Sequence, residues 1–408
     1  MIVLSGATLV LAGAVRSPGT LVIDEGQIVD VLHGSRPSSP GEDRFDLHDH
    51  LVLPGLIDVH VHGLAGFDVL EHRGAVGEMA VRLPAFGVTA FCPTAIACTP
   101  AALADFLAEV RALRTGPAPA GARVLPAHLE SHFINPAYRG AQPERCLRRP
   151  PQSLTSSPRP AAGDPHDFDA GEVLAEISRG QSDVGIITLA PELDGATQLI
   201  DRFTEAGHRV SLGHSAATFD EGMAAVARGA RAATHLFNRM PPLHHRTPGL
   251  VGAVLACEEV AAELICDGYH VHPAVLRSAI AAKRPDRVMA ISDGTAGSGL
   301  PRGARTKLGE QAITVHESAA YLDDGTLAGS ILTMDRAFGL LVNQVGLSLP
   351  DAVTVCSTTP ARELGLRRLG VISPGAIADV TVLDRHLRVT HTFVAGKLVY
   401  ARGEGGVP

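Results

Sequence analysis

The 408-residue sequence predicts an α/β fold, a (β/α)8 barrel of the TIM type with a small β-sandwich domain built from both chain termini. Two observations predict this fold. Strand-like apolar runs alternate with amphipathic, helix-like segments over roughly 300 residues, the length that eight β/α units need. Both chain ends contain only short strand-like runs separated by turn residues. We therefore place the β-sandwich at residues 1–53 and 369–408 and the barrel at residues 54–368.

The two termini share a pattern of short strands and turns. Near the N-terminus, the apolar runs lie at residues 2–4, 8–11, 20–23 and 28–32. Near the C-terminus, they lie at residues 378–383 and 389–394, followed by a hairpin turn at Ala395-Gly396-Lys397. Neither end has enough strands to bury an apolar face alone, so we expect the two ends to combine.

The barrel is expected from the order of elements between the termini. Strand-like runs include residues 87–91 and 184–189, and helix-like segments lie at residues 100–113, 196–206, 219–228, 273–283 and 333–345. A doubly wound open sheet is the alternative, but no Gly-rich phosphate-binding motif follows the first strand. Residues 142–169 are rich in Pro, Ser and Arg, and we expect an excursion near the barrel rim or a mobile loop there.

Composition argues against several classes of partner. The formal net charge is -8, no Lys/Arg block occurs, and the chain has no Trp and four Tyr, so nucleic acid is not an expected partner. No apolar run approaches the roughly 20 residues that cross a membrane, and residues 1–14 lack the basic start of a signal peptide. The six Cys form no Cys-x-x-Cys pair, which indicates reduced thiols in a cytoplasmic protein.

Metal-ligand residues follow several predicted strands. His60 and His62 end an apolar segment, and side chains two apart on a strand face the same way, so both imidazoles can share one ion. Four further residues each close a short strand candidate: Glu130, His214, His235 and Asp293. The functional residues of a β/α barrel lie at the C-terminal strand ends. These side chains therefore predict a site for zinc, iron or manganese.

The ordered motifs resemble those of the amidohydrolase superfamily, and most closely its N-acetylglucosamine-6-phosphate deacetylase branch. The resemblance covers nearly the whole chain. The matching segments are Pro-Gly-Leu-Ile-Asp-Val-His-Val-His-Gly (54–63), His-Leu-Glu (128–130), Leu-Ala-Pro-Glu (189–192), Gly-His-Ser-Ala-Ala-Thr (213–218), Thr-His-Leu-Phe-Asn (234–238), Arg-Thr-Pro-Gly-Leu-Val-Gly-Ala (246–253), Asp-Gly-Tyr-His-Val-His-Pro (267–273), Ser-Asp (292–293) and Leu-Ala-Gly-Ser (327–330). Each segment is weak alone, but the set in this order is specific.

The resemblance implies a metal centre with one or two ions per subunit. The main catalytic metal is bound by Glu130, His214 and His235. Where His60 and His62 are retained, as here, they hold a second ion that Glu130 bridges. Zinc is the expected metal, with iron or manganese as alternatives.

The resemblance also implies roles around the substrate. Asp293 is the catalytic acid and base, and His270 and Asn238 contact the sugar. Arg246 binds the phosphate and reaches the site of a neighbouring subunit, which implies a homodimer.

The sequence departs from the family pattern near the expected substrate. Ser131-His132-Phe133 stands where the family has Gly-Pro-Phe, and Arg139-Gly140-Ala141-Gln142 stands where it has Lys-Gly-Ala-His. Arg239 replaces the Ala expected after Asn238. We therefore include Ala141, Gln142 and Arg239 among the candidate substrate contacts, and we expect retained metal chemistry with altered sugar recognition.

These observations favour a metal-dependent deacetylase that converts N-acetylglucosamine 6-phosphate to glucosamine 6-phosphate and acetate. A different N-acyl sugar is the near alternative, either N-acetylgalactosamine 6-phosphate or an unphosphorylated sugar. A cyclic amidase or an N-acyl amino acid deacylase is a further alternative, but such sites commonly use a carboxylated Lys where this chain has Glu130. A metal-free structural or binding relative would have lost ligands that this chain keeps.

Overall fold

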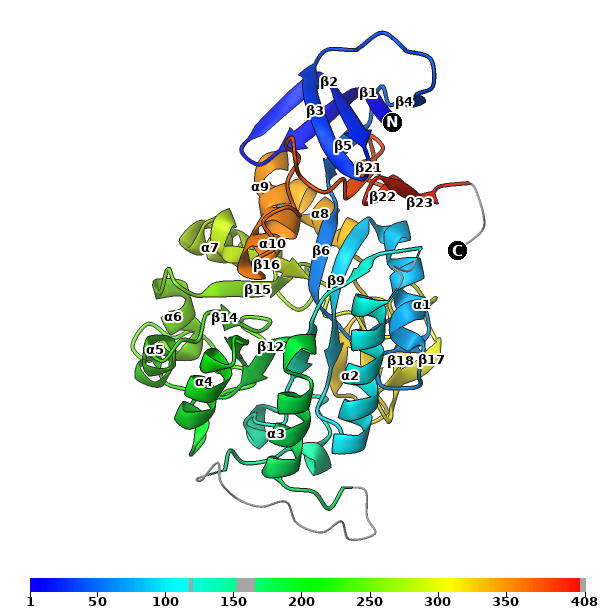
Figure 1. Ribbon diagram of the computed structural model, residues 1–408. Helices are drawn as coiled ribbons and strands as arrows, with labels where there is room; N and C mark the ends of the chain where they lie inside the picture. The colour runs from blue at the N-terminus through cyan, green and yellow to red at the C-terminus, as the bar shows by residue number, and fades with distance from the viewer. Residues whose placement is uncertain (117–119, 152–165, 404–408) are drawn as a thin grey trace.

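The computed structural model describes residues 1–116, 120–151 and 166–403, and its largest part is a barrel of parallel strands (Figure 1). The barrel strands are β6 (Leu56–Val61), β9 (Val88–Ala95), β11 (Ala127–Glu130), β12 (Val184–Leu189), β13 (Arg209–Leu212), β14 (Ala232–Ala233), β15 (Ala261–Ile265) and β16 (Val288–Ile291). They pair in parallel from β9 through β11 to β16, and β6 pairs with β9. The predicted (β/α)8 barrel is confirmed.

Two details of the barrel matter for the site. The short strand β10 (Arg123–Val124) pairs with β9 just before β11 does, so the two are parts of one barrel strand interrupted near Pro126. The backbone N of Asp293 donates to the carbonyl of His60 at 2.9 Å, and the N of His62 donates to the carbonyl of Gly294 at 2.8 Å. These bonds join the end of β16 to β6 and nearly close the ring.

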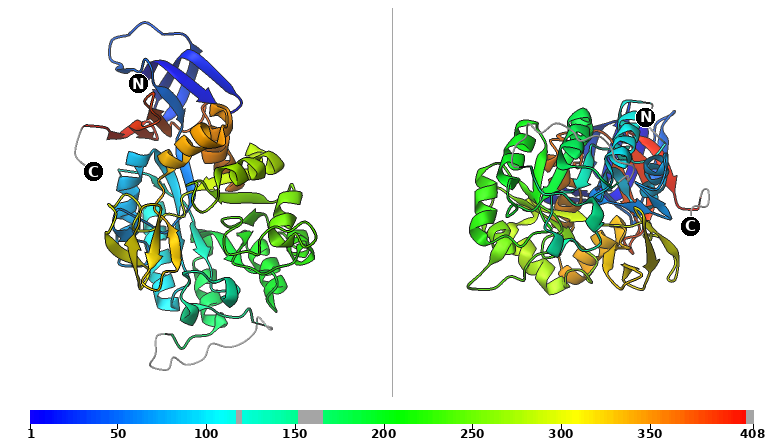
Figure 2. Two further views of the ribbon diagram at one scale, coloured as in Figure 1. Left: turned by 180° about the vertical axis from the view of Figure 1, so that it is seen from behind. Right: turned by 90° about the horizontal axis from the view of Figure 1, so that it is seen from below.

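Helices surround the barrel strands (Figure 2). They are α1 (Ala75–Arg82), α2 (Pro100–Thr115), α3 (Ala170–Arg179), α4 (Ala196–Glu205), α5 (Phe219–Ala227), α6 (Gly249–Ala256), α7 (Pro273–Lys283), α8 (Met334–Leu340), α9 (Leu349–Val353) and α10 (Thr359–Glu363). In α4 the buried residues Ala196, Leu199, Ile200 and Phe203 recur at helical spacing, so one apolar stripe faces the strands. The helix expected at residues 333–345 consists of α8 and a π-helical turn, Leu341–Val345.

Both termini contribute to one separate sheet at the N-terminal side of the barrel (Figure 1). Its strands are β1 (Ile2–Leu11), β2 (Ala14–Asp24), β3 (Gln27–His33), β4 (Asp43–Asp46), β5 (Leu51–Pro54), β21 (Val380–Leu383), β22 (Val389–Val394) and β23 (Lys397–Ala401). β4 and β22 do not pair, yet the rings of Phe45 and Phe393 lie 5.4 Å apart edge to face. The sheet therefore curls over its own apolar core, and the expected union of the two termini is confirmed; the domain boundaries at residues 53 and 369 remain a prediction.

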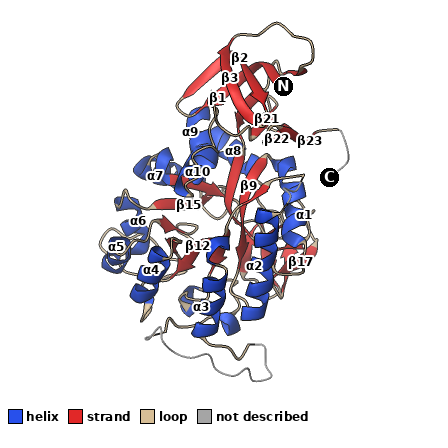
Figure 3. Ribbon diagram, in the orientation of Figure 1, coloured by secondary structure: helices blue, strands red, loops and turns tan. Residues whose placement is uncertain are grey.

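A four-stranded antiparallel meander between β16 and α8 was not anticipated (Figure 3). It comprises β17 (Arg305–Leu308), β18 (Gln311–Val315), β19 (Ala319–Leu322) and β20 (Leu327–Ser330). A two-stranded hairpin, β7 (Gly63–Leu64) and β8 (Phe67–Asp68), follows β6 directly. The meander buries Leu308, Ile313 and Ala328 against Ile96, which follows β9, so it forms one wall at the C-terminal end of the barrel.

Three further observations bear on the sequence predictions. All six Cys are free and buried. None of the helices in the described ranges is long and apolar enough to cross a membrane. Half of the Pro-, Ser- and Arg-rich segment at residues 142–169, namely residues 152–165, lies outside the described residues.

Candidate metal centre

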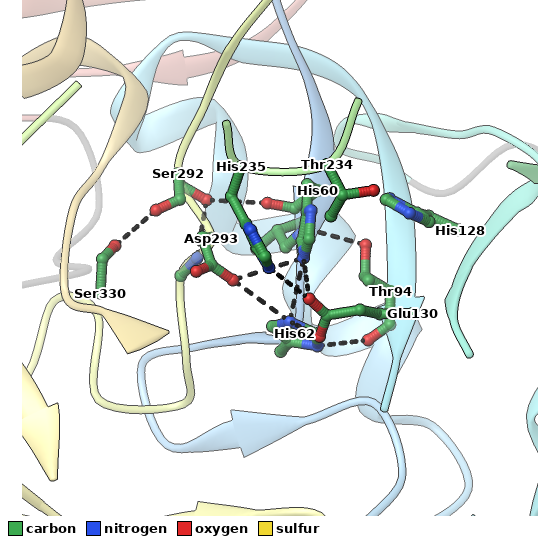
Figure 4. Close-up of polar contacts among 12 residues, drawn as sticks. His60, His62, Thr94, His128, Glu130, Thr234, His235, Ser292, Asp293 and Ser330 are labelled. Carbon is green, nitrogen blue, oxygen red and sulfur yellow. Dashed lines mark hydrogen bonds and ion pairs between the residues drawn. The ribbon is translucent and has the colours of Figure 1, made fainter. Parts of the chain in front are cut away.

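Six ligand-type side chains converge at the C-terminal ends of the barrel strands, and Figure 4 shows His60, His62, Glu130, His235 and Asp293 among them. They come from the ends of β6, β11, β13, β14 and β16, and they are His60, His62, Glu130, His214, His235 and Asp293. All six are buried, with at most 7% of any residue exposed. The structure therefore brings together every metal ligand that the sequence predicted.

Glu130, His214 and His235 form the first group of donor atoms. Oε1 of Glu130 lies 2.9 Å from Nε2 of His214 and 2.8 Å from Nε2 of His235. The two imidazole Nε2 atoms are 3.0 Å apart. The three donor atoms come from the ends of three different strands and are directed at one point. Such an arrangement is suited to binding a divalent ion.

His60, His62 and Asp293 form the second group. Their facing atoms are close, with 3.1 Å between the two Nε2 atoms and 3.3 Å from Oδ1 of Asp293 to each of them. Oε2 of Glu130 lies 3.4 Å from Nε2 of His62. Because its Oε1 faces the first group and its Oε2 the second, Glu130 is placed to bridge two ions.

Outer hydrogen bonds orient three of the imidazoles. Nδ1 of His62 donates to the carbonyl of Thr94 at 2.9 Å, and Nδ1 of His214 donates to the carbonyl of Tyr138 at 2.8 Å. Nδ1 of His60 donates to a side chain instead, Oε2 of Glu263, at 3.0 Å. When Nδ1 carries the proton, the lone pair of Nε2 points into the site, which is the arrangement that a metal ligand needs.

The site stabilises positive charge. Burial alone would lower the pKa of His62, but hydrogen bonds to Asp293 and Glu130 raise it to about 10. Burial alone would raise the pKa of Asp293, but the neighbouring His60 and His62 lower it to about 2. The pKa of Glu130 likewise lies well below its usual range, because His214 and His235 outweigh its burial. Both carboxylates are therefore ionised at neutral pH and available to hold cations.

Three of the ligand-type residues adopt a left-handed backbone conformation. The φ angles are 48° at His214, 29° at His235 and 47° at Asp293. Such a conformation costs about 1–3 kcal/mol for a residue other than glycine and persists where the surroundings impose it. At Asp293 these surroundings include the bond to β6 and a bond from the N of Ser330 to its carbonyl at 2.9 Å.

A cavity of about 300 Å³ opens onto the two groups. The candidate substrate contacts Ala141, Gln142, Asn238, Arg239 and His270 all line it. Nδ1 of His270 is bonded to Oδ2 of Asp267 at 2.6 Å, which leaves Nε2 for the cavity. The meander completes the wall with Leu308 and Leu327.

Arg239 and Arg246 are placed differently. Arg239 lines the cavity, where its Nη2 donates to the carbonyl of Leu327 at 3.2 Å and its side chain packs on Gly140. Arg246 is exposed, does not line the cavity of its own chain, and bonds through Nη1 to Nε2 of His245 at 2.9 Å. A contact of Arg246 with a neighbouring subunit therefore remains a prediction.

Gln142 has a role that the sequence did not reveal. Its Oε1 accepts from the backbone N of Ala97 at 2.8 Å, and its Nε2 donates to Oε2 of Glu130. The nearby replacement His132 is buried and bonds through Nε2 to the carbonyl of Cys98 at 2.7 Å, so it does not line the cavity.

Sequence reasoning missed two buried carboxylates beneath the site. Asp58 accepts from Oγ of Ser292 at 2.5 Å and steadies the strand end that carries Asp293. Glu263 is bonded to His60 from the middle of β15. The available signal was an acidic residue inside an otherwise apolar strand-like run, which is costly unless the charge has a partner.

Comparison with known proteins agrees with this geometry. A model of the amidohydrolase family matches residues 51–399. A zebrafish (Danio rerio) N-acetylglucosamine-6-phosphate deacetylase is 35% identical over 403 residues, which cover 96% of this chain and 91% of that protein. An N-acetylgalactosamine-6-phosphate deacetylase of Escherichia coli O157:H7 is 34% identical over 352 residues, covering 85% of this chain and 87% of that protein.

A similar solved structure contains a sugar phosphate. It is a mutant N-acetyl-D-glucosamine-6-phosphate deacetylase from Mycobacterium smegmatis in complex with N-acetyl-D-glucosamine-6-phosphate. The two structures superpose with a TM-score of 0.87 at 30% identity, over 98% of this chain and 99% of that chain.

Proposed function

Because the chain belongs to the amidohydrolase family, in its N-acetylglucosamine-6-phosphate deacetylase branch, it is a hydrolase of amide bonds, and we propose that it deacetylates N-acetylglucosamine 6-phosphate. The observation that carries the proposal is the position of Glu130 between two groups of metal-ligand atoms, beside Asp293 and at the base of the cavity. The donor set fits a divalent metal, since two carboxylates and four imidazoles lie within one buried site. Zinc, held as one or two ions, is the proposed metal.

Asp293 is proposed to carry the proton. A divalent ion bound at this site lowers the pKa of a water molecule from about 15.7 to about 7 and so supplies hydroxide at neutral pH. With its pKa held at about 2, Asp293 is ionised and accepts the proton of the attacking nucleophile as that nucleophile adds to the amide carbonyl carbon. It then returns that proton to the departing amine, which leaves as the amino sugar while acetate remains.

His270 and Asn238 are proposed to bind and orient the acetamido sugar. Asp267 holds the His270 ring in place through Nδ1, so Nε2 is the ring nitrogen proposed to contact the amide oxygen. Asn238 lines the same cavity at the end of β14. Their contribution is to orient the amide carbon toward the metal-ligand groups.

Phosphate binding is proposed to involve two arginines. Arg239 lies in the cavity of its own chain and offers a guanidinium fork suited to an anion. Arg246 is exposed and is proposed to reach the neighbouring site in a homodimer. The buried, unpaired cysteines support a cytoplasmic location for this enzyme.

N-acetylgalactosamine 6-phosphate is the second candidate substrate. The similarity to the Escherichia coli deacetylase of that sugar favours it. The test is acetate release from both sugar phosphates and from the unphosphorylated sugars. We expect efficient release from N-acetylglucosamine 6-phosphate, and equal or absent release from all four compounds would refute the sugar-phosphate proposal.

A further inference from the structure

Glu263 is a carboxylate buried within the barrel. It lies in the middle of β15, between the fully buried Ala262 and Leu264, and none of its own surface is exposed. Its side chain points to the base of the metal centre rather than to solvent, since its partner is His60. A charged group in such a position is costly unless it is paired, so its partners indicate what it does.

The main partner of Glu263 is the imidazole of His60. Oε2 of Glu263 accepts from Nδ1 of His60 at 3.0 Å and has a weaker contact of 3.4 Å with the backbone N of His235. Oε1 has no hydrogen-bond partner in the described part of the chain. Glu263 is therefore oriented almost entirely toward one side chain.

A separate metal site built on Glu263 is not favoured by the same contacts. Glu263, His60 and His128 are close enough to hold an ion. However, His128 uses Nδ1 for the carbonyl of Val59 at 3.1 Å and Nε2 for Oγ1 of Thr188 at 2.8 Å. With both nitrogens of His128 engaged and Nδ1 of His60 already bonded, no imidazole lone pair is left for an ion there.

The bond to Glu263 has a direct consequence for the cavity side of His60. It fixes the proton on Nδ1, so the lone pair of Nε2 points toward Nε2 of His62 and Oδ1 of Asp293. Two of the other ligand imidazoles, His62 and His214, obtain this orientation from neutral backbone carbonyls, at Thr94 and Tyr138. Among these three, His60 alone has a carboxyl group as its partner, and a carboxylate acceptor raises the basicity of the ligand nitrogen.

We propose that Glu263 is a positioning residue that makes His60 a metal ligand and thereby sustains the second ion, at His60 and His62. The proposal rests on the proposed two-ion centre. It predicts a selective effect, because Glu263 has no hydrogen bond to the side chain of Glu130, His214 or His235 and contacts His235 only at the backbone N, at 3.4 Å. The first ion should bind equally well with or without this carboxylate.

The test is the number and affinity of bound Zn²⁺ ions in the Glu263→Gln variant, measured by equilibrium dialysis against a competing chelator with elemental analysis. Loss of such an outer partner typically weakens metal binding about 10–100-fold, and we expect this loss for the second ion alone. Asp183→Asn is the matched control: Asp183 is 1% exposed and paired with Arg111 and Arg114, just before β12 and away from the site. It should leave both affinities unchanged.

The outcomes separate the proposal from its premise. Two ions in wild type and unchanged second-ion affinity in folded Glu263→Gln would overturn the role of Glu263. One ion in saturated wild type would instead refute the two-ion centre, and neither count depends on which amide is cleaved. If Glu263→Gln fails to fold, nitrogen-15 NMR of the wild-type imidazoles decides: the proposal requires the proton of His60 on Nδ1, and a proton on Nε2 contradicts it.

Discussion

Gln142 donates a hydrogen bond from its side-chain Nε2 to Oε2 of Glu130, while its Oε1 accepts one from the backbone N of Ala97. Gln142 thus links the loop after β9 to the carboxylate placed to bridge two ions. Through this contact Gln142 orients the side chain of Glu130, a candidate metal ligand. Gln142 also lines the cavity.

The first prediction follows from that contact. Gln142→Ala frees Oε2 of Glu130 to rotate, so we expect kcat to fall roughly 10–100-fold together with weaker metal binding. Steady-state kinetics and metal titration measure the two effects. A rise in KM with unchanged kcat and metal affinity would assign Gln142 to sugar binding alone.

Asp293→Asn separates metal binding from proton transfer. The amide keeps the shape of the side chain but cannot accept the proton, and general acid–base catalysis contributes about 10²–10⁴-fold. We expect kcat to fall by that factor while the ion bound by Glu130, His214 and His235 stays in place, as measured by elemental analysis. A variant that retains near-wild-type kcat would refute the acid/base role.

Arg239→Ala tests phosphate recognition within one chain. The guanidinium lines the cavity, so its removal should raise KM for a phosphorylated substrate much more than KM for the unphosphorylated sugar. Equal changes for the two substrates would mean that Arg239 is structural, through its bond to the carbonyl of Leu327.

The proposed role of Arg246 can be tested through subunit assembly. If it reaches the neighbouring site, inactive Arg246→Ala and inactive Asp293→Asn chains should complement each other when mixed. In the mixed dimer, the Arg246→Ala chain keeps Asp293 and receives Arg246 from its partner, so one complete site forms. Recovery of up to about a quarter of wild-type activity in an equal mixture is expected, since half of the dimers are mixed and each has one of two sites. No recovery after demonstrated subunit exchange would contradict the shared site.

Metal removal should abolish activity reversibly. Dialysis against a chelator removes the source of hydroxide at neutral pH, and readdition of Zn²⁺ should restore the rate. Parallel readdition of Fe²⁺ and Mn²⁺ compares the alternative metals. Full activity in protein shown by elemental analysis to be metal-free would exclude the proposed chemistry.

The sequence predicted the barrel and the metal ligands because both depend on local patterns. Glu130, His214, His235 and Asp293 each close an apolar run, and parallel strands bring such positions to one end of a barrel. The meander was missed because strands such as Arg305-Thr306-Lys307-Leu308 are short and largely polar. Only packing against Ile96 reveals what they bury.

The two supporting contacts were beyond sequence reasoning for a different reason. Glu263 was visible as an acidic residue in an apolar run, but its partner His60 lies 203 residues away. Gln142 was visible as a replacement, but a substitution does not reveal that the amide faces Glu130. Both roles depend on long-range geometry rather than on local pattern.

The central claim is tested most directly by the rate of acetate release from N-acetylglucosamine 6-phosphate by the zinc-loaded enzyme, with N-acetylgalactosamine 6-phosphate alongside. The account predicts efficient turnover of the gluco compound, abolished in Asp293→Asn. No turnover of either sugar phosphate by protein with a full metal complement would contradict it and would indicate that Gln142 and Arg239 serve a different N-acyl substrate.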